Sequence, residues 1–258
     1  MYEQIKLERP AEHVARVVLN RPDQANAFSA QLLDELDHAV QAIAADDDVR
    51  VWMLTGAPRD DGRPWFSAGL DMKDALSGAV PAVEPVRIVD LIDDMLKPSI
   101  AVINGLCTTG ALEVALACDL RVAARSARLS DLHLERSGLG IGGWGMAARL
   151  SRLVGVDKAK ELLLLSCEVD GTEAARIGLV NRVVEDAELD AFALDWAVTL
   201  ASRPRRGIRT TLGYLSLQSE MSKREAMRWA ELAPELMGLT LRPFSDAAAR
   251  FFDQREQP

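Results

Sequence analysis

One carboxylate stands alone in a stretch of sequence that is otherwise suited to a buried helix. Residues 105–118 read GLCTTGALEVALAC, and Glu113 is the charged residue among them. Burying an unpaired carboxylate is costly, so Glu113 predicts a site that offsets this cost. A backbone N–H at Gly110 could hold a developing oxyanion while Glu113 acts as a general acid or base. The alternative is that Glu113 only complements the helix dipole in the first turn.

A second stretch, residues 65–73 with the sequence WFSAGLDMK, has a comparable turn. The small residues before Asp71 predict a tight entry into a helix, which leaves backbone N–H groups unpaired. The simpler interpretation is an ordinary loop with Asp71 as the helix N-cap. Two such glycine-entered helices are more informative than one, because an oxyanion hole needs two converging donors.

A third stretch places a group that can transfer protons before a run of glycines. Residues 130–135 read SDLHLE, and residues 138–145 read GLGIGGWG. These glycines permit close backbone approach to a ligand, but they do not form a dinucleotide fingerprint, because no strong strand precedes them. His133 alone is more typical of a structural histidine. The chain has three histidines without paired ligand spacing, so no metal site is expected.

Composition bounds the classes of function. The 258 residues fit one large domain or one domain with a small appendage, and hydrophobic residues at 48% allow an ample core. A net charge of −9 argues against a nucleic-acid or membrane-surface binder. Cys107, Cys118 and Cys167 lack metal-ligand spacing and indicate buried thiols in a reducing compartment. We expect a cytoplasmic protein, because no secretory signal or membrane span is recognisable.

The hydrophobic pattern alternates between strands and helices. We expect paired strands at residues 2–8 and 13–19 with a turn at 9–12, and a helix that starts after an N-cap at Ser29. Further apolar runs predict buried strands at 51–56, 100–103 and 120–124. From residue 155 onward the pattern is mostly helical. This order predicts an α/β layered core followed by a C-terminal helical region.

Taken together, these segments resemble the crotonase (enoyl-CoA hydratase/isomerase) superfamily over nearly the whole chain. The matching segments are residues 19–22 (LNRP), 66–71 (FSAGLD), 97–101 (KPSIA), Gly110 with Glu113, 149–155 (RLSRLVG) and 175–180 (ARIGLV). The resemblance implies an α/β spiral of ββα units over residues 1–195. It also implies a C-terminal helical trimerisation region, residues 196–258, in a homotrimer or hexamer (a dimer of trimers).

The resemblance further implies an acyl-CoA thioester substrate, with no cofactor besides the coenzyme A that the substrate carries. Glu113 falls on the first catalytic glutamate of the family, and the oxyanion hole on the backbone N–H groups of Ala68 and Gly110. Substrate and CoA contacts are expected at Arg21, Gln24, Ala25, Ala27, Phe66, Ala68, Gly69, Leu70, Asp71, Lys73 and Trp144. The C-terminal region also carries more apolar residues than one chain can bury, so subunit contacts are expected at Phe192, Trp196, Trp229, Leu232, Leu236, Phe244, Phe251 and Phe252.

The second catalytic glutamate of the family is displaced in this sequence. Counted forward from residues 127–129, its position holds His133; counted back from residues 154–155, it holds Glu135. We favour Glu135, because paired carboxylates divide the acid and base roles of water addition well. The alternatives are that His133 fills the position, or that Glu135 is a solvated surface residue beside Arg136.

The resemblance implies an enoyl-CoA hydratase, which adds water to a 2-enoyl-CoA through a thioester enolate and yields a 3-hydroxyacyl-CoA. One alternative is an enoyl-CoA isomerase or another crotonase reaction that uses only Glu113. A further alternative, from a different class, is a catalytically weak subunit that binds acyl-CoA. Fold-level resemblance alone does not decide among these reactions.

Overall fold

The computed structural model describes residues 2–236, and its first compact unit, Met1–Arg205, is built on a six-stranded sheet. In spatial order the strands are β1 (Ile5–Ala11), β2 (Val14–Leu19), β3 (Val51–Gly56), β5 (Ser99–Ile103), β7 (Leu120–Ala124) and β10 (Arg182–Val184). The pair β1–β2 is antiparallel and the other neighbours are parallel. Every residue of β5 is buried, as expected for a parallel strand covered on both faces.

The first strand runs further than the sequence predicts. Strand β1 continues through Pro10 to Ala11, so the turn lies at residues 12–13 instead of 9–12. Strand β1 is at the edge of the sheet, where a proline without an N–H removes no ladder hydrogen bond. The pairing register with β2 is irregular between Glu8 and Ala11, and this irregularity accommodates Pro10.

A second, four-stranded sheet carries the spiral. Its strands are, in spatial order, β4 (Trp65–Ser67), β6 (Leu106–Thr108), β8 (Arg128–Ser130) and β9 (Val169–Asp170). Strands β4, β6 and β8 each follow a strand of the large sheet along the chain and pair in parallel with one another. Parallel neighbours end at the same edge of a sheet, so the segments that follow these three strands are brought together. This arrangement confirms the predicted spiral of ββα units.

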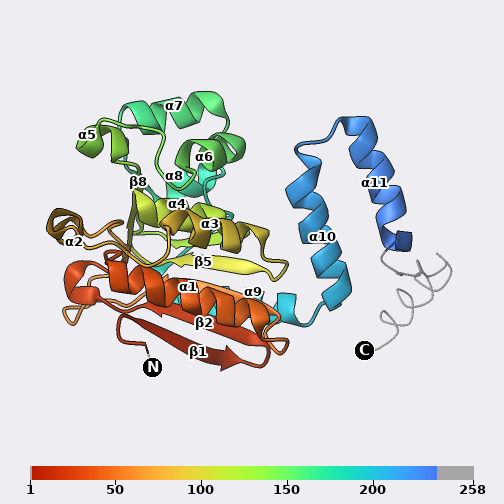
Figure 1. Ribbon diagram of the computed structural model, residues 1–258, viewed down its shortest axis with the longest axis horizontal. Helices are drawn as coiled ribbons and strands as arrows, with labels where there is room; N and C mark the ends of the chain where they lie inside the picture. Colours follow the sequence, from red (N-terminus) through yellow and green to blue (C-terminus); the bar gives the residue numbers. More distant parts are fainter. Residues whose placement is uncertain (1, 237–258) are drawn as a thin grey trace. The chain divides into compact units, whose positions relative to one another are not determined.

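Helices complete each turn of the spiral. They are α1 (Ala30–Ala45), α2 (Met72–Ser77), α3 (Pro85–Asp94), α4 (Gly110–Ala117), α5 (His133–Ser137), α6 (Met146–Val154), α7 (Val156–Leu164), α8 (Gly171–Arg176) and α9 (Leu189–Ala201), with short 3₁₀ turns at Pro22–Gln24 and Asp186–Glu188. The predicted cap is confirmed, because the Ser29 hydroxyl accepts from Leu32 N at 3.1 Å. In Figure 1, α5, α6 and α7 gather at the end of this unit opposite β1.

The boundary between the two compact units lies at residues 205/206, later than the predicted 195/196. The predicted boundary would divide α9. This helix packs against β3 and β5, and its residues Ala193 and Ala197 are fully buried. Its small side chains allow close approach to the sheet, so α9 belongs to the first unit.

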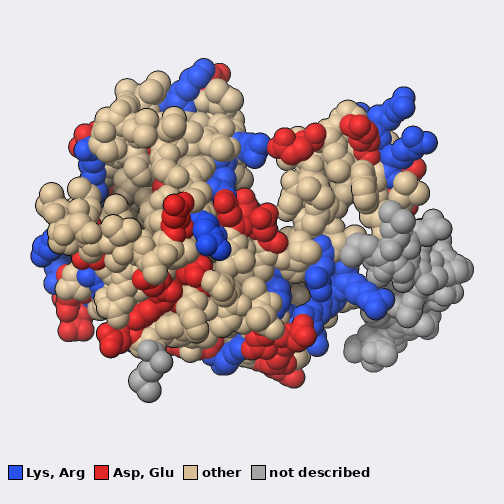
Figure 2. Space-filling model, in the orientation of Figure 1, with Lys and Arg blue, Asp and Glu red and all other residues tan. Residues whose placement is uncertain are grey.

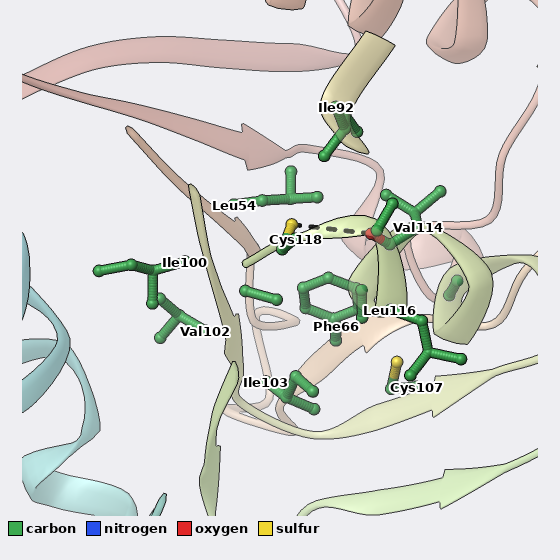
Figure 3. Close-up of a cluster of buried hydrophobic side chains, with 14 of the residues drawn as sticks. Leu54, Phe66, Ile92, Ile100, Val102, Ile103, Cys107, Val114, Leu116 and Cys118 are labelled. Atoms are coloured by element: carbon green, nitrogen blue, oxygen red, sulfur yellow. Dashed lines mark hydrogen bonds between the residues drawn. The ribbon is translucent and has the colours of Figure 1, made fainter. Parts of the chain in front are cut away.

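Phe66 lies in the hydrophobic core rather than on a ligand-binding surface. Figure 3 shows its ring among Ile103, Leu116 and Cys118, and Phe66 is fully buried. The Cys118 thiol donates to the Val114 carbonyl oxygen at 3.6 Å, and burial raises the pKa of Cys118 to about 12. The expectation that the Phe66 side chain contacts CoA is therefore corrected: it holds β4 against the sheet instead.

The surface of the first unit mixes charges of both signs. Figure 2 shows acidic and basic side chains interspersed over one face, and several form ion pairs, such as Arg149 with Asp93 at 3.0 Å. Pairs in which both side chains are exposed, such as Arg125 with Glu185 at 2.7 Å, contribute at most about 1 kcal/mol each. Among the helices described, none is both long enough and apolar enough to cross a membrane.

The second unit, Arg206–Pro258, is described as far as residue 236. It contains nearly all of α10 (Arg205–Gln218) and the whole of α11 (Lys223–Leu236). Two of the predicted interface residues, Trp229 and Leu232 of α11, are about half exposed. Phe192 and Trp196 lie on α9 instead and pack against the core of the first unit. The remaining ones fall outside the described structure: the side chain of Leu236, and Phe244, Phe251 and Phe252.

The placement of Phe66 predicts a stability effect. Phe66→Ala should lower the free energy of unfolding by about 3–5 kcal/mol, because it removes buried apolar surface and leaves a cavity. Phe66→Leu retains most of the volume and should cost less. Urea denaturation measures both. Leu76→Ala is the control: this side chain is 86% exposed, so the change should stay within about 0.5 kcal/mol. Equal losses in the two alanine variants would contradict the core position.

Candidate active site

Glu113 is buried in the first turn of α4, with 1% of the residue exposed. Its Oε1 accepts hydrogen bonds from Trp144 N at 2.7 Å and Met146 N at 3.0 Å. Because Met146 is the first residue of α6, the carboxylate also faces the positive end of that helix dipole. Burial raises the pKa of Glu113 above its ordinary value, and the two N–H donors oppose this rise.

The glycine-rich run is needed to bring these donors to Glu113. Gly142 has φ +70°, and a methyl group there would lie 2.5 Å from the Met146 Cβ and 3.1 Å from the Glu113 Cδ. A larger residue is therefore excluded by both backbone conformation and space. The run 138–145 folds the backbone tightly over the carboxylate.

His133, the first residue of α5, faces the free oxygen of the same carboxylate. Its Nε2 lies 3.7 Å from Glu113 Oε2, and its Nδ1 lies 2.5 Å from Asp131 Oδ1. The hydrogen bond to Asp131 raises the pKa of His133 above its ordinary value, although burial opposes the shift. A carboxylate bonded to Nδ1 fixes the ring orientation and leaves Nε2 to exchange protons with the site.

Glu135 does not join this group. It is exposed and lies outside the cavity that His133 lines. Two residues along a helix correspond to a rotation of about 200°, so a side chain two positions after His133 points to the other side of α5. The expectation that favoured Glu135 as the partner of Glu113 is therefore corrected to His133.

The predicted oxyanion donors also need one correction. Ala68 N donates to the Ala25 carbonyl oxygen at 3.0 Å, so it has no free proton to offer a ligand. Within residues 2–236, neither Leu70 N nor Gly110 N has a hydrogen-bond acceptor, and both residues line the cavity. The donor pair supported by the structure is Leu70 with Gly110.

Gly69 brings these two donors close together. Its φ is +82°, and a methyl group placed on it would lie 2.8 Å from the Thr108 carbonyl oxygen and 3.3 Å from Gly110 N. Only glycine permits this approach of the turn after β4 to the turn after β6. Two unpaired N–H groups on adjacent turns suit a developing oxyanion.

A cavity of about 380 Å³ joins the groups. The start of α4 and the region of α5 supply its polar residues, including Glu113, His133 and Arg136. Most of the remaining wall is apolar, formed by Leu70, Met72, Ala75, Leu132, Leu139 and Trp144. The Trp144 ring lies directly against Gly110 and 6.1 Å from the Phe28 ring, centroid to centroid. Such a chamber suits a small acyl group held by a few fixed polar contacts.

Some of the predicted CoA contacts are residues that hold a loop in place, and others are exposed at the surface. The Arg21 guanidinium is paired with Asp71 at 2.9 Å and also donates to the Ala27 carbonyl oxygen. Asp71 caps α2 by accepting from Lys73 N, so this pair fixes the loop against the helix that follows Leu70. Gln24 and the Lys73 side chain are exposed, and Ala25 is partly buried. None of these lines the cavity, and their contact with CoA stays a prediction.

Asp131, the residue that orients His133, is not among the site residues predicted from the sequence. The signal was present, because Asp131 stands two positions before His133 and directly after the strand β8. It was overlooked because both residues alone are more typical of structural roles. The buried carboxylate, 2% exposed, becomes informative only when its contact with the imidazole is seen.

Replacing Asp131 should change the titration of His133. In Asp131→Asn the pKa of His133 should fall, because the hydrogen-bonded carboxylate that raises it is removed. NMR titration of the imidazole signals measures this shift, and with three histidines in the chain the spectrum is simple. The signals of His13 and His38 serve as internal references. An unchanged or raised His133 pKa would contradict the geometry.

Comparison with known proteins identifies the family to which the chain belongs. The model of the enoyl-CoA hydratase/isomerase family matches residues 9–233. The chain is 34% identical to a probable enoyl-CoA hydratase of Mycobacterium bovis, over 97% of this chain and 90% of that one. It is 38% identical to a crotonyl-CoA hydratase of Syntrophomonas wolfei, over 73% and 72% of the two chains. The crystal structure of an enoyl-CoA hydratase from Bacillus anthracis superimposes with a TM-score of 0.85 at 29% identity, covering 98% of this chain and 97% of that one. By sequence and by fold, this chain belongs to the enoyl-CoA hydratase/isomerase family, the crotonase superfamily.

Proposed function

We propose that this chain is an enoyl-CoA hydratase that adds water across the 2,3 double bond of a 2-enoyl-CoA. The observation that carries the proposal is the facing pair of Glu113 Oε2 and His133 Nε2, 3.7 Å apart in a cavity that Leu70 and Gly110 also line. Two proton-transferring groups beside unpaired N–H donors supply what a hydration needs. The hydratases among the relatives support the same reaction.

Water is activated between the two facing atoms. The Glu113 carboxylate accepts a proton from the water as the oxygen bonds to C3 of the acyl chain. The electron pair of the double bond moves to the thioester oxygen and forms an enolate. His133, as the imidazolium, then donates its Nε2 proton to C2, which completes the 3-hydroxyacyl-CoA.

The enolate is held by backbone N–H groups rather than by a positive charge. Donors at Leu70 and Gly110 would bind the thioester oxygen most strongly when it carries charge, and each donor of this kind is worth about 3–4 kcal/mol of transition-state stabilisation. The negative charge exists only briefly, so neutral donors avoid trapping the intermediate.

The site can reset without outside help. After the reaction Glu113 holds a proton and His133 has lost one, and with 3.7 Å between Oε2 and Nε2 the next water can carry the proton from one group to the other. We propose accordingly that no cofactor is required beyond the CoA of the substrate. The three cysteines without disulfides support a cytoplasmic location.

Three matched variants test the assignment on crotonyl-CoA. Glu113→Gln and His133→Gln should each lower kcat/KM by roughly 10²–10⁴-fold, as expected for a lost general acid or base. Glu135→Gln is the control and should remain within about threefold of the parent. Loss of the enoyl-thioester absorbance reports the rate.

In the parent, kcat/KM should fall as pH drops through the raised pKa of Glu113 and as pH rises through the raised pKa of His133.

The same variants separate the alternatives. If His133→Gln stays active while Glu135→Gln loses activity, the second group is Glu135. If only Glu113→Gln loses activity and the parent converts 3-enoyl-CoA to 2-enoyl-CoA, the chain is an isomerase. Saturable acyl-CoA binding without turnover of either thioester would indicate a binding subunit.

We also propose that the chain forms a homotrimer, alone or paired as a hexamer. The support is that Trp229 and Leu232, three residues apart on α11 and thus on one side of that helix, are each about half exposed. Light scattering at micromolar concentration should give at least three times the mass of the 28.2 kDa chain. Trp229→Glu should shift the distribution towards monomer. A monomeric parent would refute the assembly.

A further inference from the structure

One cation in the active-site cavity has no partner. Arg136 lines the cavity from α5, and within residues 2–236 no acceptor or carboxylate lies within hydrogen-bond or ion-pair distance of its guanidinium. By contrast, the neighbouring Ser137 hydroxyl donates to the His133 carbonyl oxygen at 2.7 Å. The proposed reaction uses Glu113 and His133 and leaves Arg136 without a role.

The position of Arg136 relates it to the reacting carbons. It follows His133 by three residues, so the two side chains lie on the same face of α5, separated by about 4.5 Å of helical rise. His133 would act at C2 of the acyl chain. A group recognised by Arg136 would then lie a few carbons beyond the double bond, on the same side of the cavity.

The positive charge of Arg136 contrasts with the mostly apolar residues that line the rest of the cavity. Arg136 is itself exposed to solvent, and the cavity that it lines also includes the apolar residues Leu70, Met72 and Ala75. The chain as a whole carries a net charge of −9, which repels anions. The positive charge of Arg136 is therefore a local feature that could attract an anionic group of the ligand. A guanidinium in such a setting matches a planar anion such as a carboxylate, which it can bind through two parallel hydrogen bonds.

We infer that Arg136 selects a 2-enoyl-CoA whose acyl chain ends in a carboxylate, so that the substrate is the CoA thioester of a short dicarboxylic acid. This inference rests on the proposed function for the reaction, but it concerns binding of the acyl chain. Arg136 is thus a specificity-determining residue, whereas Glu113 and His133 carry out the chemistry.

Saturated thioesters test the inference separately from turnover, because they cannot be hydrated. Hexanoyl-CoA and adipoyl-CoA are a matched pair in which a carboxylate replaces the terminal methyl group. Titration calorimetry on the full chain should show adipoyl-CoA binding on the order of 10–100-fold more tightly, as expected for a charge-assisted pair. Arg136→Gln should abolish this preference and leave the Kd for hexanoyl-CoA within about twofold.

A matched control removes the same charge elsewhere. Arg182 lies on β10, is exposed and does not line the cavity, so Arg182→Gln should keep the parent's preference for adipoyl-CoA. If Arg136→Gln weakens both thioesters equally, the arginine contacts the CoA phosphates and the inference is wrong. It is also wrong if the parent shows no preference, or if the preference survives in Arg136→Gln.

Turnover is then measured with 2-hexenoyl-CoA and 2-hexenedioyl-CoA. Hydration of both by the parent, with a loss confined to 2-hexenedioyl-CoA in Arg136→Gln, supports both conclusions. Selective binding of adipoyl-CoA without any hydration would refute the proposed reaction and support the carboxylate site. Hydration with equal kcat/KM values for the two substrates in both proteins would support the reaction and overturn the role of Arg136.

Discussion

The buried carboxylate of Glu113 is the constraint on which the site depends. A charge that is 1% exposed is tolerable only with hydrogen-bond partners, and here two backbone N–H groups at the start of α6 supply them. This requirement fixes the path of residues 138–145, the need for glycine at Gly142 and the position of the Trp144 ring over Gly110. Both donors bind the same oxygen, so Oε1 anchors the group and Oε2 remains for chemistry.

The three parallel strands of the small sheet explain why distant segments meet at the cavity. Strands β4, β6 and β8 are neighbours and run in the same direction, so their ends deliver Leu70, Gly110 and His133 to one edge. The strands are three residues long and contribute little stability by themselves. The large sheet and the core around Phe66 hold these strands in place. The residues that stabilise the fold are therefore different from the residues that line the cavity.

Long apolar elements were predictable from the sequence, and short or convergent features were not. The strands at 51–56, 100–103 and 120–124 have runs of buried residues that only a core requires. Three-residue strands such as β8 show no periodicity. Counting along the chain could not decide between His133 and Glu135, because the answer depends on which face of α5 meets the cavity. The sequence indicated Ala68 N as an oxyanion donor, but in the structure Ala68 N donates to the Ala25 carbonyl oxygen, and a hydrogen bond of this kind cannot be read from a sequence.

The pair Asp131–His133 can replace a carboxylic acid without altering the charge balance of the site. Ionised Asp131 with a protonated imidazole is neutral, like a protonated glutamic acid, and it carries one negative charge after the imidazole gives up its proton, like a glutamate. A second carboxylate beside Glu113 would repel it and force the two groups to share a proton. An imidazolium attracts Glu113 instead, so each group can keep the protonation state it needs. The imidazolium is a weaker acid than a carboxyl group, which places the proton donor's working range closer to neutral pH.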